Sequence, residues 1–363
     1  MTNAEKVLHT LSAAGYETYF VGGCVRDTLL GRPVHDRDIA TAALPEQVMA
    51  LFPKCVPTGL KHGTVTVLEG GEPFEVTTFR CDGSYHDGRH PDAVAFVREL
   101  REDLSRRDFT VNAMAMDLAG NVTDLFGGRE DLKKKIIRCV GDPATRFGED
   151  ALRMLRAFRF SAQLGFTVEP KTLAAIQDCA PLCTSLSAER VRDEVEKTLL
   201  SPAPETVGKM AAYGLLAQYH IGTGDLTALR TLPCERAVRW AGCFRADPDA
   251  SWADLRLDKK TGKTASRAAQ LAGTCQTRLD WKRLLSREGE DTARVCAALT
   301  GDTATVEEIL RSGECLYLRD LAVGGDDLAS VPKKRIGGTL WRLLDHVLEH
   351  PGDNTREKLL KLL

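Results

Sequence analysis

The pattern of hydrophobic and polar positions changes about one third of the way along the chain. In the first ~130 residues, short alternating or β-branched runs are separated by turn residues, a pattern typical of strands mixed with helices. After Asp131 the strand signal nearly disappears and hydrophobic residues recur at helical spacing. The expected strands are 16–21, 37–41, 64–68, 74–79, 93–97 and 113–118. The expected helices are 148–163, 170–178, 188–199, 204–215 and most of 263–363.

These patterns predict an α+β head, with a mixed sheet and helices, followed by an all-α remainder. The chain has 363 residues, which is enough for two or three domains with their own cores. Segments rich in proline, glycine or aspartate interrupt the helical part at 201–204, 222–225, 247–249 and 324–325.

Composition and charge are those of an ordinary globular protein. Hydrophobic residues make up 43% of the chain and charged residues 28%, and the formal net charge is −2. A nucleic-acid-binding protein with this balance must concentrate its positive charge locally. Two segments do so, because 129–159 carries nine Arg or Lys against five Asp or Glu, and 331–363 carries seven against four.

The cysteines and the hydropathy pattern indicate a reducing compartment. The eleven cysteines are odd in number and scattered, without the spacing of a disulfide framework or a zinc site. No signal peptide is apparent, and no apolar run approaches the roughly 18 residues of a membrane span. We therefore expect a cytoplasmic protein that does not enter a membrane.

The strongest chemical signal lies in residues 20–41. A hydrophobic strand ends in Gly22-Gly23, a short helix follows, and a second strand opens with Asp36-Arg37-Asp38. Side chains alternate along a strand, so Asp36 and Asp38 should point the same way. Neighbouring carboxylates repel each other unless a cation lies between them, and hard oxygen ligands favour Mg²⁺ or Mn²⁺.

The glycine pair completes this signal. Glycines allow backbone N–H groups to approach phosphates at a helix N-terminus. Alone, Gly22-Gly23 would be typical of a turn, and an Asp-x-Asp of a solvated strand end. Together they predict a phosphate cradle beside a carboxylate pair, and hence nucleotidyl transfer.

The chain resembles class II CCA-adding enzymes and bacterial poly(A) polymerases, which are template-independent RNA nucleotidyltransferases of the DNA polymerase beta superfamily. The first motif is Gly-Gly-x-x-Arg-Asp-x-Leu-Leu-Gly followed by Asp-x-Asp. Further stretches resemble the family's next four motifs, although Leu125 stands where the family usually has proline. These stretches are 103–117, 124–132, 149–156 and 187–194.

The resemblance also implies a domain arrangement. The catalytic head of the polymerase-beta nucleotidyltransferase type would span 1–130, and a helical neck for nucleotide-base recognition 131–200. A helical body would span 201–270, and a helical, tRNA-binding tail 271–363. Only the first of these boundaries has good support from the sequence itself.

For the catalytic step, the resemblance implies that Asp36 and Asp38 hold two metal ions, which such sites place about 3.5–4 Å apart. One ion would help the RNA 3′-hydroxyl lose its proton, and the other would neutralise the departing pyrophosphate. Glu75 is the candidate third carboxylate, and the alternative for Glu75 is a surface position at a strand end.

The residues expected to bind the nucleotide come from three motifs. Arg26 would bind the triphosphate, because guanidinium groups bind phosphate oxygens in pairs, and Asp27 would cap the helix or pair with an arginine. The polar cluster of the second motif would recognise the ribose and support the phosphates, or else form a helix-end salt bridge. The expected set is Gly22, Gly23, Arg26, Asp27, Arg106, Arg107, Asp108, Asn112, Asp150, Arg153 and Arg156.

The fourth motif is expected to select the base. At helical spacing, Glu149, Asp150 and Arg153 should lie on one face of a helix, where they could simply form a stabilising ion pair. The resemblance instead implies a protein template, in which Arg153 donates to the acceptor edge of cytosine and Asp150 accepts from the amino group of cytosine or adenine. Wrong bases would leave these hydrogen bonds unmade.

Two other segments carry expectations. The polar loop 82–92 contains Tyr-x-Asp-x-Arg-x-Pro, which the resemblance links to the switch to the final A and which argues against an enzyme that adds only CC. Lys333, Lys334 and Arg335 are expected to contact the tRNA backbone.

The sequence therefore predicts a tRNA nucleotidyltransferase that uses CTP, ATP and Mg²⁺ to build or repair the 3′ CCA end. A poly(A) polymerase and an enzyme that adds only the terminal A share the motifs and remain alternatives. The stretch Lys-His-Gly-Thr-Val-Thr-Val-Leu at 61–68, and the lack of a long arginine-rich extension, favour CCA addition. An inactive RNA-binding protein on the same fold would not need all three carboxylates, and a metal-dependent phosphohydrolase would need a second His-Asp cluster.

Overall fold

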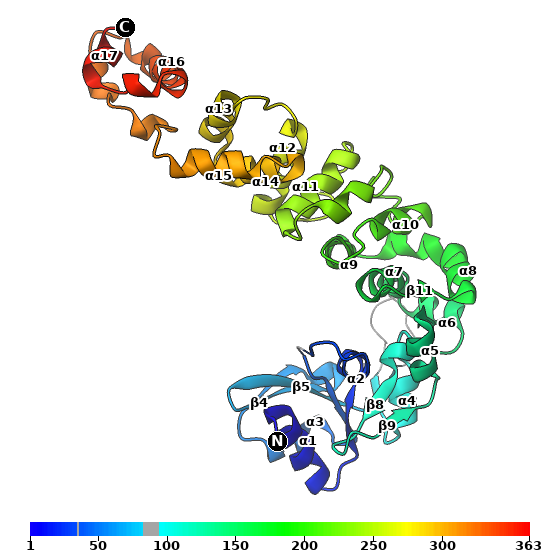
Figure 1. Cartoon of the computed structure of the whole chain (residues 1–363). Helices are drawn as coiled ribbons and strands as arrows, with labels where there is room; N and C mark the ends of the chain where they lie inside the picture. The colour runs from blue at the N-terminus through cyan, green and yellow to red at the C-terminus, as the bar shows by residue number, and fades with distance from the viewer. Residues whose placement is uncertain (35, 83–93) are drawn as a thin grey trace. The chain divides into compact units, whose positions relative to one another are not determined.

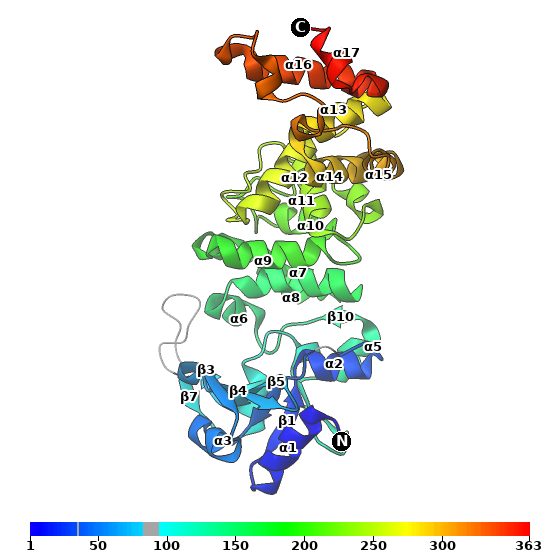
Figure 2. The same ribbon diagram turned by 90° about the vertical axis from the view of Figure 1, so that its left-hand side faces the viewer.

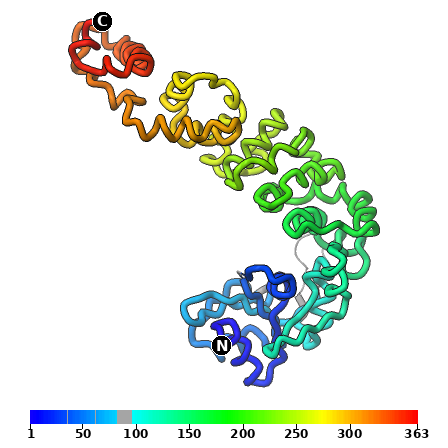
Figure 3. The backbone as a smooth tube through the Cα atoms, in the orientation of Figure 1, coloured from blue at the N-terminus to red at the C-terminus, as the bar shows by residue number. Residues whose placement is uncertain are grey.

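The chain divides into two compact units, Met1–Gln218 and Tyr219–Leu363 (Figure 1). The computed structural model describes residues 1–34, 36–82 and 94–363. The loop motif expected at 82–92 therefore lies outside the described residues, apart from its first position. Figure 3 traces the backbone through both units. The finer division into head, neck, body and tail stays a prediction.

The head contains a seven-stranded mixed sheet in the order β3-β4-β5-β2-β1-β8-β9. The strands β2 and β5 pair in parallel, and the other neighbours in this sheet pair antiparallel. This confirms the mixed sheet that the alternating pattern predicts. Its strands are β1 (Thr18–Val21), β2 (Ile39–Thr41), β3 (Cys55–Gly59), β4 (Thr64–Glu69), β5 (Glu72–Thr78), β8 (Met114–Met116) and β9 (Val122–Asp124).

The two edge strands were not among the strands expected from the sequence. The edge strand β3 contains Pro57 and ends in Gly59, which weaken a strand signal but are tolerated where one side of the backbone has no partner. A separate two-stranded antiparallel pair joins β6 (Arg80–Asp82) to β7 (Val94–Phe96).

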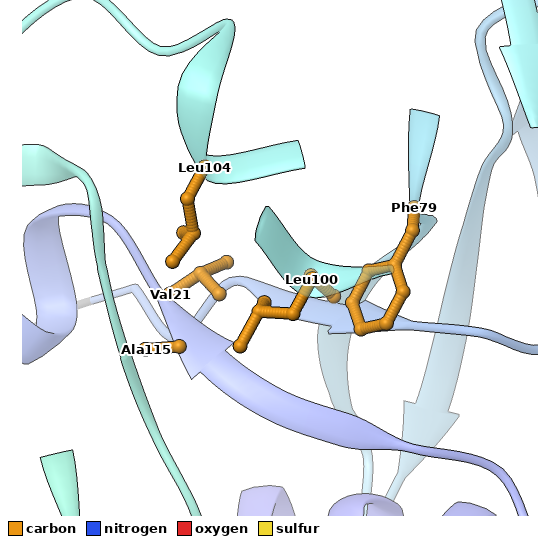
Figure 4. Packing of buried hydrophobic residues seen from close by; sticks show 6 residues of the cluster. Val21, Phe79, Leu100, Leu104 and Ala115 are labelled. Atoms are coloured by element: carbon orange, nitrogen blue, oxygen red, sulfur yellow. The ribbon is translucent and has the colours of Figure 1, made fainter. Parts of the chain in front are cut away.

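Helices cover the sheet through hydrophobic residues spaced three or four apart. The first helix, α1, starts at a capping box between Thr2 and Glu5, and it packs together with α3 against β4. The helix α4 packs Leu100 and Leu104 onto a cluster that includes Val21 (Figure 4). The helical segments of the head are α1 (Asn3–Ala13), α2 (Gly23–Leu29), α3 (Pro45–Leu51), η1 (Leu60–His62), α4 (Leu100–Ser105), η2 (Thr110–Asn112) and α5 (Gly128–Lys134).

The rest of the first unit is helical and centres on α7, which packs against α9 and α10 (Figure 2). A two-residue parallel pair, β10 with β11, is the one strand pairing described after the head. The elements are β10 (Ile136–Ile137), α6 (Pro143–Glu149), α7 (Leu152–Leu164), β11 (Thr167–Val168), α8 (Pro170–Cys179), η3 (Ala180–Ser185), α9 (Ala188–Leu199) and α10 (Thr206–Ala212).

The single helix expected at 148–163 is wrong, because the structure has two helices there. The helix α6 ends at Glu149, and Asp150 adopts an extended conformation with φ −148° and ψ 105°. The carboxylate of Asp150 then accepts a hydrogen bond from the backbone N–H of Leu152, at 3.1 Å. Aspartate favours positions near helix starts because its oxygens satisfy free N–H groups, so Asp150 ends α6 and supports the first turn of α7 instead of continuing α6.

The second unit is helical, as the pattern of 263–363 predicts. A small core near its end joins Val323, Leu328, Leu343, Val347 and Leu359. Within the described residues, no helix is long and apolar enough to cross a membrane. The elements are η4 (Thr227–Thr231), α11 (Arg236–Ala246), α12 (Lys259–Leu271), α13 (Arg278–Glu288), α14 (Glu290–Thr300), α15 (Thr303–Arg311), η5 (Leu318–Asp320), η6 (Gly325–Leu328), η7 (Lys333–Arg335), α16 (Ile336–Glu349), η8 (Pro351–Asp353) and α17 (Arg356–Leu360).

Candidate functional site

The glycine pair forms the turn between β1 and α2. Gly22 has φ +75° and ψ −135°, a conformation open essentially to glycine. A Cβ atom at Gly22 would lie 3.1 Å from Nη1 of Arg107, and one at Gly23 would lie 3.5 Å from Nη2 of Arg26. The missing side chains therefore let two guanidinium groups approach the backbone of the turn.

Arg26 is buried and held at both ends of its guanidinium group. Its Nε and Nη2 donate to the two carboxylate oxygens of Asp27, at 3.0 and 2.8 Å. Its Nη1 donates to Oδ1 of Asn112 at 2.7 Å, although the two residues are 86 positions apart. Of the two expectations for Asp27, the structure shows the pairing with an arginine.

Arg106 and Arg107 share one buried carboxylate, that of Asp103. Nη2 of Arg106 lies 2.7 Å from one oxygen, and Nη2 of Arg107 lies 2.9 Å from the other. Burial alone would raise the pKa of Asp103, but the charges of Arg107 and Arg106 outweigh it and lower that pKa. Asp103 is therefore held as a carboxylate between two guanidinium groups.

Asp108 is likewise a buried carboxylate that pairs with an arginine, Arg156. One of its oxygens accepts from Nε of Arg156 at 2.8 Å, and the other accepts from Nδ2 of Asn112 at 3.2 Å. Burial opposes ionisation of Asp108, yet Arg156 lowers its pKa overall. Burial also works against the charged form of Arg156, but Asp108 and Glu194 raise the pKa of this arginine.

The fourth motif is arranged differently from the expectation of one helix face. Arg153 pairs with Glu149 at 2.5 Å, as its spacing predicts. Asp150, in its extended conformation, pairs instead with Arg190 of α9, at 2.8 Å between Oδ2 and Nη2. The helix break at Asp150 thus separates the two carboxylates and turns Asp150 toward α9.

A single aromatic ring lies among three of these arginines. Phe160 of α7 is almost fully buried. The guanidinium carbons of Arg26 and Arg156 each lie 5.2 Å from its ring centroid, and that of Arg159 lies 3.9 Å away. Cations at these distances are attracted to the negative face of an aromatic ring.

These groups surround a pocket of about 380 Å³ within the first unit. Ten of the eleven residues expected to bind the nucleotide line it, and Asp27 lies behind Arg26. Its lining has six arginines against three aspartates, so it suits an anion such as a polyphosphate. The lining residues are Gly22, Gly23, Arg26, Asp38, Arg106, Arg107, Asp108, Asn112, Asp150, Leu152, Arg153, Arg156, Phe160 and Arg190.

Of the three predicted catalytic carboxylates, Asp38 lines this pocket, whereas Asp36 and Glu75 do not. Asp36 and Asp38 precede β2, which begins at Ile39 and not at the expected residue 37. Because Ile39 pairs with Val76 of β5, Asp38 and Glu75 hold equivalent positions, one residue before this pair, on neighbouring strands. The two carboxylates therefore come from adjacent places on the sheet.

Burial and the neighbouring charges change the pKa of Asp38. Asp38 loses part of its hydration at the pocket, and this loss together with the charges of Glu75 and Asp36 raises its pKa, while Arg107 opposes the change. All three carboxylates also line a second pocket of about 860 Å³, whose other lining residues include Thr66, Glu72 and Phe74. Asp38 is shared by both pockets.

The donor set fits a hard divalent cation. It offers only carboxylate oxygens, and the pKa of Asp38 is raised by burial and also by repulsion from Glu75 and Asp36, a repulsion that a bound cation would relieve. Within residues 1–34, 36–82 and 94–363, no three His, Cys, Asp or Glu side chains already lie close enough to hold a metal ion.

Sequence reasoning did not single out Asp103, Phe160 and Arg190. Asp103 precedes Arg106 and Arg107 by three and four positions, a helical spacing that could have indicated the pairing. Arg190 lies within the fifth motif, but its partner Asp150 is 40 positions away. The predicted RNA-binding residues Lys333, Lys334 and Arg335 lie exposed in the second unit.

Comparison with known proteins identifies the family. A family described as "Poly A polymerase head domain" matches residues 18–138, and one described as "Probable RNA and SrmB- binding site of polymerase A" matches residues 165–220. A CCA-adding enzyme of Enterococcus faecalis is 39% identical over 98% of this chain and 94% of its own length. The chain belongs to the CCA-adding enzyme family. Membership in this family implies the use of a divalent metal ion.

Other relatives of the family agree. A CCA-adding enzyme of Lactobacillus helveticus is 59% identical over 55% of this chain, and that match spans about half (50%) of the relative. The crystal structure of the Bacillus stearothermophilus CCA-adding enzyme in complex with CTP is 35% identical, has a TM-score of 0.85 and covers 99% of this chain and 96% of its own. The Thermotoga maritima CCA-adding enzyme complexed with tRNA_CCA is 21% identical with a TM-score of 0.69, and it supports the fold.

We predict that Gly22→Ala weakens CTP binding by about tenfold. The new Cβ would displace the Arg107 guanidinium, and the positive φ would cost about 1–2 kcal/mol of folding free energy. CTP affinity measured by calorimetry, with unfolding followed by circular dichroism, checks both effects.

The matched control is Gly31→Ala. Gly31 also has a positive φ of +65°, but a Cβ there meets nothing within 4 Å. We expect Gly31→Ala to lose stability and keep its CTP affinity. Equal loss of affinity in the two variants would contradict a specific role for the Gly22 turn.

Proposed function

We propose that this chain adds C, C and A to the 3′ end of tRNA, using CTP and ATP and releasing pyrophosphate. The observation that carries the proposal is the position of Asp38, which lines both an arginine-rich pocket and a carboxylate-rich pocket. Transfer between two substrates requires them to meet at the reacting phosphorus. A nucleotide in the first pocket and an RNA end in the second would meet at Asp38.

The arginine-rich pocket would hold the nucleoside triphosphate. Backbone N–H groups at the Gly22-Gly23 turn, with Arg26, Arg106 and Arg107, would bind the phosphates. Asp108 and Asn112, which already exchange a hydrogen bond, would face the ribose hydroxyls. The relative crystallised in complex with CTP supports this assignment, since it shares the fold at 35% identity.

For the metal, we propose Mg²⁺, or Mn²⁺ in its place, at Asp36 and Asp38, with Glu75 beside them. When bound, such ions make the 3′-hydroxyl more acidic and offset the charge of the departing pyrophosphate. The chain's own contribution is to hold the carboxylates on adjacent strands next to the phosphate-binding arginines.

The base would be selected by Asp150 and Arg153. Arg153 is held at the pocket wall by Glu149 and by the backbone carbonyls of Arg146 and Arg106, so the direction of its guanidinium group is set. Arg190 holds Asp150 at the pocket wall. A carboxylate accepts from the amino group that cytosine and adenine share, whereas uracil and guanine present a carbonyl at the equivalent position.

The tRNA would also contact the second unit. Lys333, Lys334 and Arg335 are exposed directly before α16, and Trp341 on that helix is 45% exposed. Side chains at Gly337 and Gly338 would meet nothing within 4 Å, so the helix backbone is open to a partner there. We propose that this surface binds tRNA phosphates.

We further propose the four-part division into 1–130, 131–200, 201–270 and 271–363. The head-domain match at 18–138 supports the first boundary. A cytoplasmic location is proposed from the eleven cysteines, which are odd in number and lack the spacing of a disulfide framework.

The proposal predicts ordered addition to a tRNA transcript that lacks its last three nucleotides. With CTP, ATP and Mg²⁺, we expect C, C and then A to be incorporated and addition to stop. The Asp36→Ala/Asp38→Ala variant should show no incorporation, read by gel and by sequencing of the product.

Other outcomes would reassign the protein. A long A tail on any RNA would indicate a poly(A) polymerase, and a single A on CC-ended tRNA only would indicate an A-adding enzyme. No incorporation under any condition would indicate a protein that keeps the fold without its chemistry.

We predict that Asp150→Asn admits UTP. The new amide can donate to the carbonyl of uracil, so the preference for CTP over UTP should fall by about 1–3 kcal/mol, roughly fivefold to 150-fold. Steady-state kinetics with each nucleotide give the ratio. Asp178→Ala, on the exposed part of α8, is the control and should leave the ratio unchanged. An unchanged ratio in Asp150→Asn would remove Asp150 from base selection.

We predict that replacing Lys333, Lys334 and Arg335 together by Ala raises KM for tRNA and leaves KM for CTP unchanged. Loss of three phosphate contacts should also reduce the dependence of log KM on log salt by about two to three units of slope. The control removes three exposed lysines from α12, Lys259, Lys260 and Lys263. Equal effects in both variants would point to overall charge and not to this surface.

A further inference from the structure

We infer that Asp103 is a positioning residue for nucleotide binding, whose buried carboxylate holds Arg106 and Arg107 at the pocket wall, with Arg107 beside the glycine turn. The inference rests on the proposed function, because Arg106 and Arg107 are among the arginines proposed there to bind the triphosphate. It concerns how the pocket is built, so it can also be tested with an anion that takes no part in transfer.

The contacts fix the plane of each guanidinium group. One oxygen of Asp103 accepts from Nε and Nη2 of Arg106, at 3.2 and 2.7 Å. The other accepts from Nε and Nη2 of Arg107, at 3.3 and 2.9 Å. Two donors on one oxygen leave a guanidinium little freedom to rotate, and both oxygens are used in this way.

The carboxylate itself has a rigid support. Asp103 lies on α4 between Leu100 and Leu104, whose side chains pack against Val21 and Phe79 (Figure 4). The Asp103 side chain is 0% exposed, whereas those of Arg106 and Arg107 are 17% and 19% exposed at the pocket. The leucines therefore fix the helix α4 to the sheet. Because Asp103 lies on this helix, its contacts hold the two arginines in a fixed position relative to the sheet.

The two arginines contribute to the pocket differently, Arg107 through its guanidinium group and Arg106 also through its backbone. Nη1 of Arg107, which Asp103 does not contact, lies 3.1 Å from the place that a Cβ on Gly22 would occupy. The backbone carbonyl of Arg106 accepts from Nη2 of Arg153 at 3.0 Å. Asp103 thus directly contacts Arg107, which lies beside the glycine turn proposed to bind phosphates. It is linked to Arg153, the arginine proposed to read the base, through Arg106.

Charge and position predict opposite effects of removing this carboxylate. Asp103 lowers the local charge, so its neutralisation makes the pocket more positive and, by charge alone, should strengthen binding of a polyphosphate. If its main role is to position the arginines, neutralisation should weaken binding, because an amide offers a donor to guanidinium groups that need an acceptor. Whether polyphosphate affinity rises or falls therefore decides between a role in charge and a role in positioning.

The experiment is calorimetric binding of inorganic tripolyphosphate to the full chain, without divalent metal, in the wild type and in Asp103→Asn. We expect affinity to fall by about tenfold or more. The matched control is Asp131→Asn, since Asp131 is a buried aspartate of the same unit that accepts from Thr110 and Arg138 and does not line the pocket. Its affinity should equal that of the wild type.

A double-mutant cycle gives a second test. Arg107→Gln should cost about tenfold in tripolyphosphate affinity in the wild type, but less than threefold in Asp103→Asn, where Arg107 is already misplaced. If Asp103→Asn does not fold, Asp103→Glu takes its place. It keeps the charge and moves the carboxylate by one methylene, and it should also weaken binding by at least threefold.

Several results would overturn the inference. These are stronger or unchanged binding in Asp103→Asn, an equal loss in Asp131→Asn, full additivity in the cycle, or a wild type that does not bind tripolyphosphate. Weaker binding in Asp103→Asn together with no nucleotide incorporation by the wild type would retain the inference and reject the proposed transfer reaction.

Discussion

Mutual repulsion among six guanidinium groups is the constraint on which the pocket depends. Like charges within a few ångströms of one another in a partly desolvated pocket repel strongly, so the arginines stay together only because carboxylates lie between them. The carboxylates come from four places: beside the glycine turn, and in the second, fourth and fifth motifs. They are Asp27, Asp103, Asp108, Glu149, Asp150 and Glu194.

The carboxylates offset the charge of the arginines, and because several of them are buried they also make the arrangement rigid. A buried carboxylate without its partner would cost about 3–5 kcal/mol, so Asp103 and Asp108 each strongly favour the conformation in which their arginines are in place. The directions of the pKa shifts agree, because both carboxylates stay ionised despite burial. A pocket already ordered in this way binds a polyphosphate without first immobilising long side chains, and this saves part of the entropy of binding.

The sequence predicts local structure better than it predicts long-range pairing. The glycine turn and the carboxylates were visible because Gly22-Gly23 and Asp36-x-Asp38 lie within one short stretch. The contact between Arg26 and Asn112 was not visible, since it joins residues 86 positions apart and depends on how α2 meets η2. The break at Asp150 was missed because hydrophobic periodicity runs through it, whereas the local hydrogen bond of an aspartate decides it. The edge strand β3 was missed for a related reason, since Pro57 removes a donor that only an inner strand would need.

Asp38 connects the two halves of the site electrostatically. On one side it faces Arg107, which favours its ionised form, and on the other Asp36 and Glu75, which oppose it. A polyphosphate in the arginine-rich pocket would offset the charge of Arg107, so the net repulsion on Asp38 would grow and a cation at the carboxylates would become more favourable. Because such coupling is reciprocal, a cation at Asp36 and Asp38 must favour the polyphosphate by the same factor. If the proposed cation site is correct, the shared position of Asp38 between the two pockets would make binding of nucleotide and cation mutually dependent without any change in fold.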